Sequence, residues 1–150
     1  MTWILTDNPV LNEHQEAVRT RILKITTALE RELGLDGYLT IRHNFATGYD
    51  GDDSLDNEGL ATVYKTTATT TPQWEYRYAL ITWYIATAAT QTDDELIAVA
   101  LHEYLHIILS PIATLLPSTE ERPGIDKLEE FVTESLMRVI GHARGMDNIR

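Results

Sequence analysis

The segment Val99-Ala-Leu-His102-Glu103-Tyr104-Leu105-His106-Ile-Ile108 decides how this chain folds, because it sets three polar side chains in an apolar stretch. Thr92 is a suitable N-cap ahead of it and is followed by three acidic residues. We therefore predict a helix that begins there and runs to about Leu109, ending before Ser110-Pro111. Apolar residues surround the helix axis, so the helix is expected at the centre of the domain.

The spacing of the two histidines predicts a metal site. His102 and His106 are four residues apart and lie on one helical face about one turn apart, so both imidazoles can reach one ion. Glu103 borders this face, where it can hold a water without ligating the ion. Zinc lowers the pKa of such a water to about 7, and the carboxylate takes its proton as it attacks a carbonyl. We predict His102 and His106 as metal ligands and Glu103 as the catalytic base.

The alternative for the same residues is a pair of satisfied core histidines beside an incidental glutamate. An unpartnered carboxylate next to two imidazoles inside an apolar helix costs several kcal/mol, which disfavours this alternative. The chain has no cysteine, so histidine, aspartate and glutamate are its strong metal ligands, and disulfides are excluded.

A catalytic zinc needs a third protein ligand, and we look for it on the last predicted helix, Ile125 to His142. The expected core stripe of this helix is Ile125, Leu128, Val132, Leu136 and Val139. Glu129 lies at the edge of that stripe, whereas Glu130 and Glu134 are expected to point to the opposite side. We therefore choose Glu129 as the third ligand, with Glu130 as the second choice. The alternative for Glu129 is a capping-box partner of Asp126.

The remaining chain supports an α+β domain that covers residues 1–150. Apolar residues at steps of three and four predict an N-terminal helix from Asn12 to Leu33, which Gly34 ends. Runs with alternating, β-branched or aromatic residues predict a small, mostly antiparallel sheet of about three to four strands. These runs are Tyr38 to Phe45, Leu60 to Thr70 and Gln73 to Ala86, with Pro72 marking the turn between the last two.

Charge and composition limit the partners. The chain has 23 acidic and 12 basic residues, a formal charge of −11, which repels phosphate backbones and disfavours nucleic-acid binding. We find no signal peptide and no stretch approaching the roughly 18 apolar residues that span a bilayer. A cytoplasmic protein with a peptide or protein substrate is expected, and the oligomeric state stays open.

Taken together, these residues resemble the gluzincins, in which His-Glu-x-x-His on one helix is completed by a Glu on the next. The run His102-Glu-Tyr-Leu-His106, a Pro-containing loop and Glu129-Glu-Phe-Val132 is similar to small metallopeptidases encoded in phage and prophage genomes. The likeness covers roughly Trp74 to Gly141 and implies a minimal zincin-like fold. The chain also resembles the ImmA/IrrE family, but Val132-Thr133 replaces its Ala-Asn pair, so repressor cleavage is not carried over.

The resemblance also implies how a substrate is held. In zincins a strand bordering the cleft pairs with an extended substrate, a role we expect for Gln73 to Ala86. Trp74, Tyr76 and Tyr78 could floor this groove, with ordinary packing in the sheet as the alternative. A residue that stabilises the oxyanion is also expected near the cleft, and the candidates are His43, Tyr84 and His142.

Three functions are compatible with the motif. The leading hypothesis is a zinc metallopeptidase that uses a water activated by Glu103. The alternative is a catalytically inactive, zincin-like metal-binding module that acts as a protein-interaction domain. A metal-dependent nuclease is disfavoured by the acidic charge and by the lack of a third histidine near the motif. For a peptidase, the acidic surface favours basic peptides.

Overall fold

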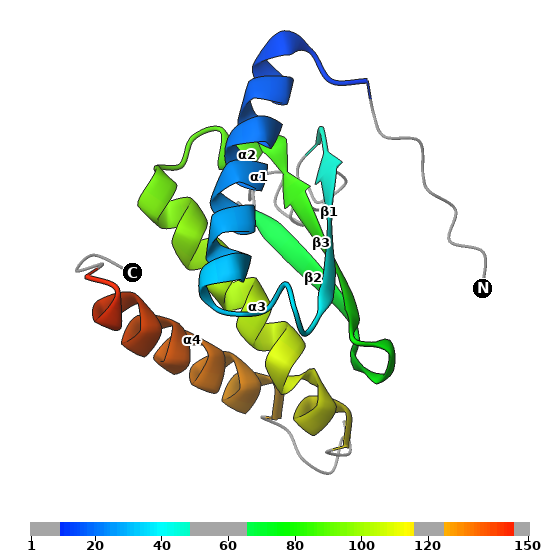
Figure 1. The fold of residues 1–150 in the computed structure, drawn as a ribbon, viewed down its shortest axis with the longest axis vertical. Coiled ribbons are helices and arrows are strands. Elements are labelled where there is room, and N and C mark those ends of the chain that lie inside the picture. The colour runs from blue at the N-terminus through cyan, green and yellow to red at the C-terminus, as the bar shows by residue number, and fades with distance from the viewer. Residues whose placement is uncertain (1–9, 49–65, 116–124, 146–150) are drawn as a thin grey trace, which may run out of the picture.

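The computed structural model describes residues 10–48, 66–115 and 125–145. The elements in chain order are α1 (Glu13–Glu32), β1 (Thr40–Ala46), β2 (Ala68–Gln73), the 3-10 turn η1 (Trp74–Tyr76), β3 (Tyr78–Tyr84), α2 (Ile85–Ala88), α3 (Asp93–Leu115) and α4 (Ile125–Ala143). This is the predicted α+β class. Figure 1 shows α1 running across the sheet, α3 beside it and α4 lying against α3.

The three strands form a mixed sheet in the order β1-β3-β2. β3 pairs in parallel with β1 and antiparallel with β2, so the prediction of a mostly antiparallel sheet is wrong. The chain passes through β2 between β1 and β3, which gives the long connection that parallel pairing needs. Ala79, Ile81 and Trp83 alternate along the central strand and are all fully buried, so this face forms the core.

The boundary between the second and third strands differs from the prediction. β2 continues through Pro72, and the chain turns at η1 instead. Arg77 closes this turn in the left-handed conformation, with φ of 52°, and its N–H donates to the carbonyl of Trp74 at 3.0 Å. Pro72 is tolerated because β2 is an edge strand among the described residues, where a missing N–H costs no ladder bond. The predicted strand from Leu60 begins outside the described residues.

Helix α1 confirms the prediction for the N-terminal segment. Asn12 is its N-cap, and its side chain and that of Gln15 exchange hydrogen bonds with each other's backbone N–H groups in a capping box. Val18, Ile22 and Leu29 are buried at helical spacing. After the helix Gly34 adopts φ of 72°, the conformation for which glycine has no Cβ penalty.

Helix α3 is longer than predicted, because it continues through Ser110 and Pro111. Proline has no N–H, so the carbonyl of Ile107 loses its normal helical donor at Pro111. The hydroxyl of Ser110 donates to this carbonyl at 2.8 Å and replaces the missing bond. The Ser-Pro pair therefore extends the helix where a break was predicted.

By length and composition alone, Asp93–Ile112 of α3 is also apolar enough to cross a membrane, with a mean hydropathy of 1.3. By this measure of length and mean hydropathy, the expectation that no stretch is apolar enough to span a bilayer is wrong. A central helix of a globular core passes the same test, and in α3 the side chains of Leu96, Leu101 and Tyr104 are almost completely buried. Their burial against the sheet and α1 provides the core of the fold.

A chain of buried polar groups links α1, α3 and the sheet. The indole N–H of Trp83 donates to Nδ1 of His43 at 3.0 Å, which leaves the proton of this ring on Nε2. Nε2 then donates to Oε2 of Glu30 at 3.1 Å, and the Tyr104 hydroxyl donates to the same oxygen at 3.1 Å. Burial, followed by the charge of Glu30, raises the pKa of Tyr104, so its hydroxyl remains a donor. Tyr104 thereby fixes the rotation of α3 about its axis.

This network predicts the effect of Tyr104→Phe. The substitution removes one donor from a half-buried carboxylate, so we expect the free energy of unfolding to fall by about 1.5–3 kcal/mol. Urea denaturation followed by circular dichroism measures it. Tyr76→Phe is the matched control, because Tyr76 is 80% exposed. Equal midpoints for the two variants would show that the Glu30 contact contributes nothing.

Candidate metal centre

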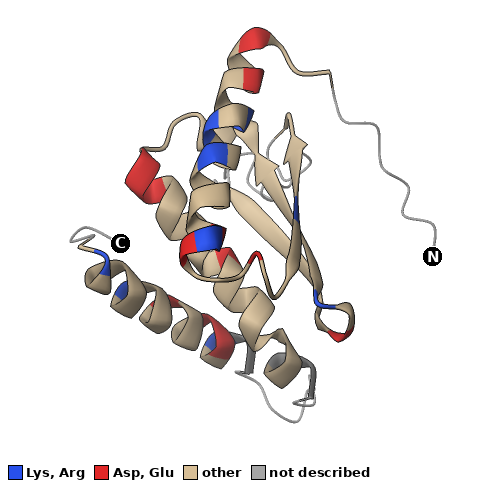
Figure 2. Cartoon of the chain, viewed as in Figure 1, with Lys and Arg blue, Asp and Glu red and all other residues tan. Residues whose placement is uncertain are grey.

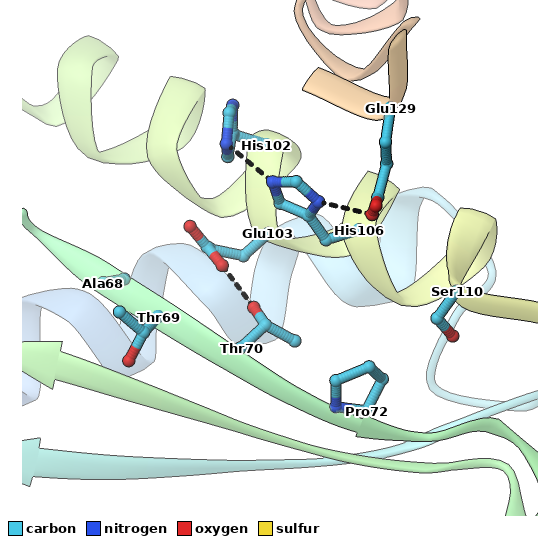
Figure 3. A pocket seen from close by; sticks show the side chains of 9 residues that line it. All are labelled: Ala68, Thr69, Thr70, Pro72, His102, Glu103, His106, Ser110 and Glu129. Atoms are coloured by element: carbon cyan, nitrogen blue, oxygen red, sulfur yellow. Dashed lines mark hydrogen bonds and ion pairs between the residues drawn. The ribbon is translucent and has the colours of Figure 1, made fainter. Parts of the chain in front are cut away.

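His102 and His106 meet on the surface of α3 that faces α4 (Figure 3). Their Nε2 atoms are 2.9 Å apart, and the rings stand edge to face with centroids separated by 4.6 Å. The prediction that the two imidazoles share one helical face is confirmed. Both side chains are largely covered, being 20% and 24% exposed, so they are held in a rigid and partly dry environment.

Three glutamates of α4 surround this imidazole pair. Glu130 approaches the Nε2 side, at 3.3 Å from His102 and 3.5 Å from His106. Glu134 contacts Nδ1 of His102 at 2.8 Å, and Glu129 contacts Nδ1 of His106 at 3.1 Å. The prediction that Glu130 and Glu134 point away is therefore wrong. Glu129, the first choice as third ligand, lies at the ring nitrogen that faces away from His102.

The orientation of α4 explains this difference. Thr133, Met137 and Gly141, at steps of four, are its buried positions. The residues of the expected core stripe that the structure describes are exposed or half-buried instead, and Phe131 beside them is 69% exposed. The stripe prediction is wrong because pairing of three carboxylates with two imidazoles turns the acidic face of the helix inward. Tertiary pairing thus overrides the amphipathic pattern.

The contacts with the glutamates bear on where the imidazole protons lie. A carboxylate accepts, so Nδ1 of His106 carries the proton that Glu129 accepts at 3.1 Å. In a neutral ring Nε2 of His106 is then an acceptor, and Nε2 of His102 donates to it at 2.9 Å. A metal ion bound by both Nε2 atoms would take the place of this proton, and the Glu130 carboxylate beside them favours a positive charge there.

The donor set fits a metal ion. One ligand atom each from His102, His106 and Glu130 lies within 4.8 Å of the others, so this group can hold a cation. A tetrahedral ion with bonds of about 2.0 Å separates its ligand atoms by about 3.3 Å. Oε1 of Glu130 lies 3.3 Å from Nε2 of His102 and Oε2 lies 3.5 Å from Nε2 of His106, each close to this spacing. The imidazole nitrogens need to separate by only a few tenths of an ångström.

Glu103 lies beside the imidazole pair, and the edge strand β2 of the sheet contacts the other side of its carboxylate. Its carboxylate is only 6% exposed and accepts a hydrogen bond from the hydroxyl of Thr70 on β2 (Figure 3). Burial raises the pKa of Glu103 above its ordinary value, and the Thr70 hydrogen bond and the nearby imidazoles oppose this increase. A buried carboxylate with a raised pKa is poised to accept a proton.

A cleft of about 540 Å³ opens in front of these groups. Ala68, Thr70 and Pro72 of β2 form one wall, and the motif residues of α3 form the other. Sequence reasoning missed Thr70, which carries no motif signal. The cleft strand is therefore β2 and not Gln73 to Ala86, and none of the three predicted floor residues lines it. Tyr76 is instead an exposed residue of η1.

The three candidates for the oxyanion-stabilising residue lie elsewhere. Both ring nitrogens of His43 are engaged in the core by Glu30 and Trp83. The Tyr84 hydroxyl contacts Thr69 at 3.4 Å, and Thr69 points away from Glu103 in Figure 3. His142 is exposed in the last turn of α4, about 18 Å along the helix from Glu130.

No protein-family model, curated protein or solved structure shows significant similarity to the chain.

The contacts of the three glutamates predict different effects of their substitution. We expect Glu130→Gln to weaken zinc binding by more than about 100-fold, because it removes a charged ligand. Glu129→Gln and Glu134→Gln should weaken binding by about 10–100-fold, because they lose the hydrogen bond that orients an imidazole. Competition with a chromophoric chelator measures the affinity, and Glu75→Gln on η1 is the control. A greater loss with Glu129→Gln would make Glu129 the ligand.

Proposed function

We propose that this protein is a zinc-dependent metallopeptidase in which His102, His106 and Glu130 bind the metal and Glu103 is the catalytic base. The observation that carries the proposal is the pair of Nε2 atoms 2.9 Å apart beside Glu130, next to a cleft that the two imidazoles line together with a buried Glu103. A ligand set for a metal and a candidate base thus lie side by side.

Two imidazoles and one carboxylate with an open fourth position are the ligand set of many catalytic zinc sites. A bound zinc supplies a Lewis acid that polarises a carbonyl and lowers the pKa of a water to about 7. Glu129 accepts from Nδ1 of His106, and Glu134 lies 2.8 Å from Nδ1 of His102, where it would accept that proton when Nε2 binds a metal. Carboxylates at the Nδ1 side would thus present both Nε2 atoms to the ion. We thus assign metal binding to Glu130 and ligand orientation to Glu129 and Glu134.

Glu103 takes the proton from the attacking water. Its place on α3 next to His102 puts the carboxylate beside the metal-binding group without making it a ligand. The Thr70 hydroxyl holds one carboxylate oxygen toward β2, so the other oxygen is free to accept the proton from water. Burial raises the pKa of Glu103, which strengthens it as a base.

The edge strand β2 supports a peptide substrate. Among the described residues β2 pairs on one side only, with β3, and its side chains line the cleft. An extended peptide can add to such an edge through main-chain hydrogen bonds, which require little sequence selectivity. The formal charge of −11 favours basic peptides through Coulomb attraction. At low salt we therefore expect a basic peptide library to be cleaved faster than an acidic one.

One observation favours the alternative, a catalytically inactive metal-binding module that holds a partner protein. None of the expected oxyanion-stabilising side chains lines the cleft in the described part of the chain. An acyl-transfer site without such a donor loses a large part of its rate enhancement. The two functions share the metal centre, so they differ only in turnover.

Glu103→Gln distinguishes these functions. Glutamine keeps the shape of the side chain but cannot accept the proton, so we expect cleavage of a fluorogenic peptide library to fall at least 1000-fold. Zinc content, measured by mass spectrometry, should remain unchanged. Glu75→Gln carries the same chemical change away from the cleft and should retain full activity. If the parent protein and Glu103→Gln release product at the same rate, the peptidase proposal is wrong.

Thr70 provides a second test of the same site. Thr70→Val keeps the side-chain shape but removes the hydroxyl that orients Glu103, so we expect kcat to fall about tenfold with little change in KM. Thr70→Ser retains a donor and should recover most of the rate. A Thr70→Val enzyme as fast as the parent would remove Thr70 from the proposed machinery.

A further inference from the structure

A second groove, distinct from the candidate metal centre, lies between α1, the start of α3 and Arg144, which directly follows α4. Its volume is about 540 Å³, and its wall contains apolar side chains from two helices, including Ile25, Leu29 and Ile97. Three basic residues, Arg21, Lys24 and Arg144, also line it. A largely apolar wall with a few charged groups is the usual composition of a site for a small ligand.

The basic residues of this groove differ in how far they are already paired. Arg21 donates from Nε to Asp93 at 2.6 Å and from Nη2 to the carbonyl of Gln91 at 2.7 Å. These two bonds hold α1 against the start of α3, so Arg21 has a structural role. Two acidic residues, Asp93 and Glu32, also line the groove and form ion pairs with Arg21 and Arg144, so the charge of Lys24 is left over.

Arg144 and Lys24 retain unused donors. Nη1 of Arg144 binds Glu32 at 2.5 Å, but its Nε is buried and has no hydrogen-bond partner among the described residues. A buried N–H without an acceptor costs about 1–3 kcal/mol. Lys24 is exposed at the same groove and has no ion-pair partner in the described part of the chain. Figure 2 shows basic residues on α1 and at the C-terminal end of α4 in blue.

We propose that this groove binds an amphiphilic anion, with its carboxylate or phosphate group between Arg144 and Lys24 and its aliphatic chain against Ile25, Leu29 and Ile97. An oxyanion can accept from Nη2 of the guanidinium, while Nη1 stays with Glu32. The Lys24 ammonium contributes a second charge. In a chain with a formal charge of −11, a groove whose three basic and two acidic residues leave a positive charge differs from the rest of the sequence.

Octanoate is the probe, with octyl phosphate to compare the two head groups and octylammonium to test the sign of the charge. Titrations followed by two-dimensional NMR of the ¹⁵N-labelled protein report saturable shifts of the amides near Ile25 and Ile97. We expect octanoate or octyl phosphate to bind and octylammonium to cause no saturable shift. Lys24→Gln should weaken binding of the anion about tenfold, as should Arg144→Gln.

Arg31→Gln is the matched control, because Arg31 is an exposed residue of α1 that does not line the groove. Its affinity for the probe should equal that of the parent. Lys24→Gln keeps the test valid if Arg144→Gln disturbs the fold, because Lys24 has no ion pair to lose within residues 10–48, 66–115 and 125–145. Equal binding of octanoate and octylammonium would overturn the proposal, and so would equal losses of affinity in Lys24→Gln and Arg31→Gln.

Discussion

The orientation of the last helix depends on the contact of two partly covered imidazoles, His102 and His106, with the carboxylates of that helix. Glu130 lies beside the two Nε2 atoms, and Glu129 and Glu134 lie at the opposite ring nitrogens. Because three carboxylates of one helix converge on two imidazoles of another, α4 can dock on α3 in one rotation only. Charge and proton geometry, more than apolar burial, thus orient the last helix.

A buried hydrogen-bond network on the core-facing side of α3 fixes the helix that carries His102 and His106. Tyr104 follows Glu103 in the chain and is directed into the core, where Glu30 accepts its hydrogen bond. His43 and Trp83 extend that bond into the sheet, so α3 cannot turn about its axis without breaking a buried network. The face of α3 that carries His102 and His106 and its core-facing side are therefore fixed together, and this preorganises the imidazoles.

Much of the fold and part of the site could be predicted from local sequence. The Asn12 cap, the apolar stripe of α1 and the histidine spacing on α3 depend on contacts within one helix, so short-range patterns determine them. The rotation of α4 depends on groups from another helix, which its own periodicity does not encode. For that reason the pattern assigned the third ligand to Glu129, whereas the geometry favours Glu130.

Local patterns also fail at the two prolines. Pro72 by itself predicts a turn, but among the described strands β2 lies at an edge, where no neighbour needs its N–H. Pro111 predicts the end of a helix, but the Ser110 hydroxyl satisfies the freed carbonyl. The parallel pairing of β1 and β3 depends on strand order, which no local residue pattern specifies.

The shallow attachment of α4 links metal content to order in the chain. This helix packs chiefly on α3 and buries few apolar side chains, so the acid–imidazole contacts carry much of its docking energy. A cation bound at this group would hold those carboxylates together, and its removal would leave their charges close to one another around the two imidazoles. A chelator should thus release α4 by local unfolding and expose its amides to hydrogen exchange, while the Glu30 network keeps α1 and the sheet protected.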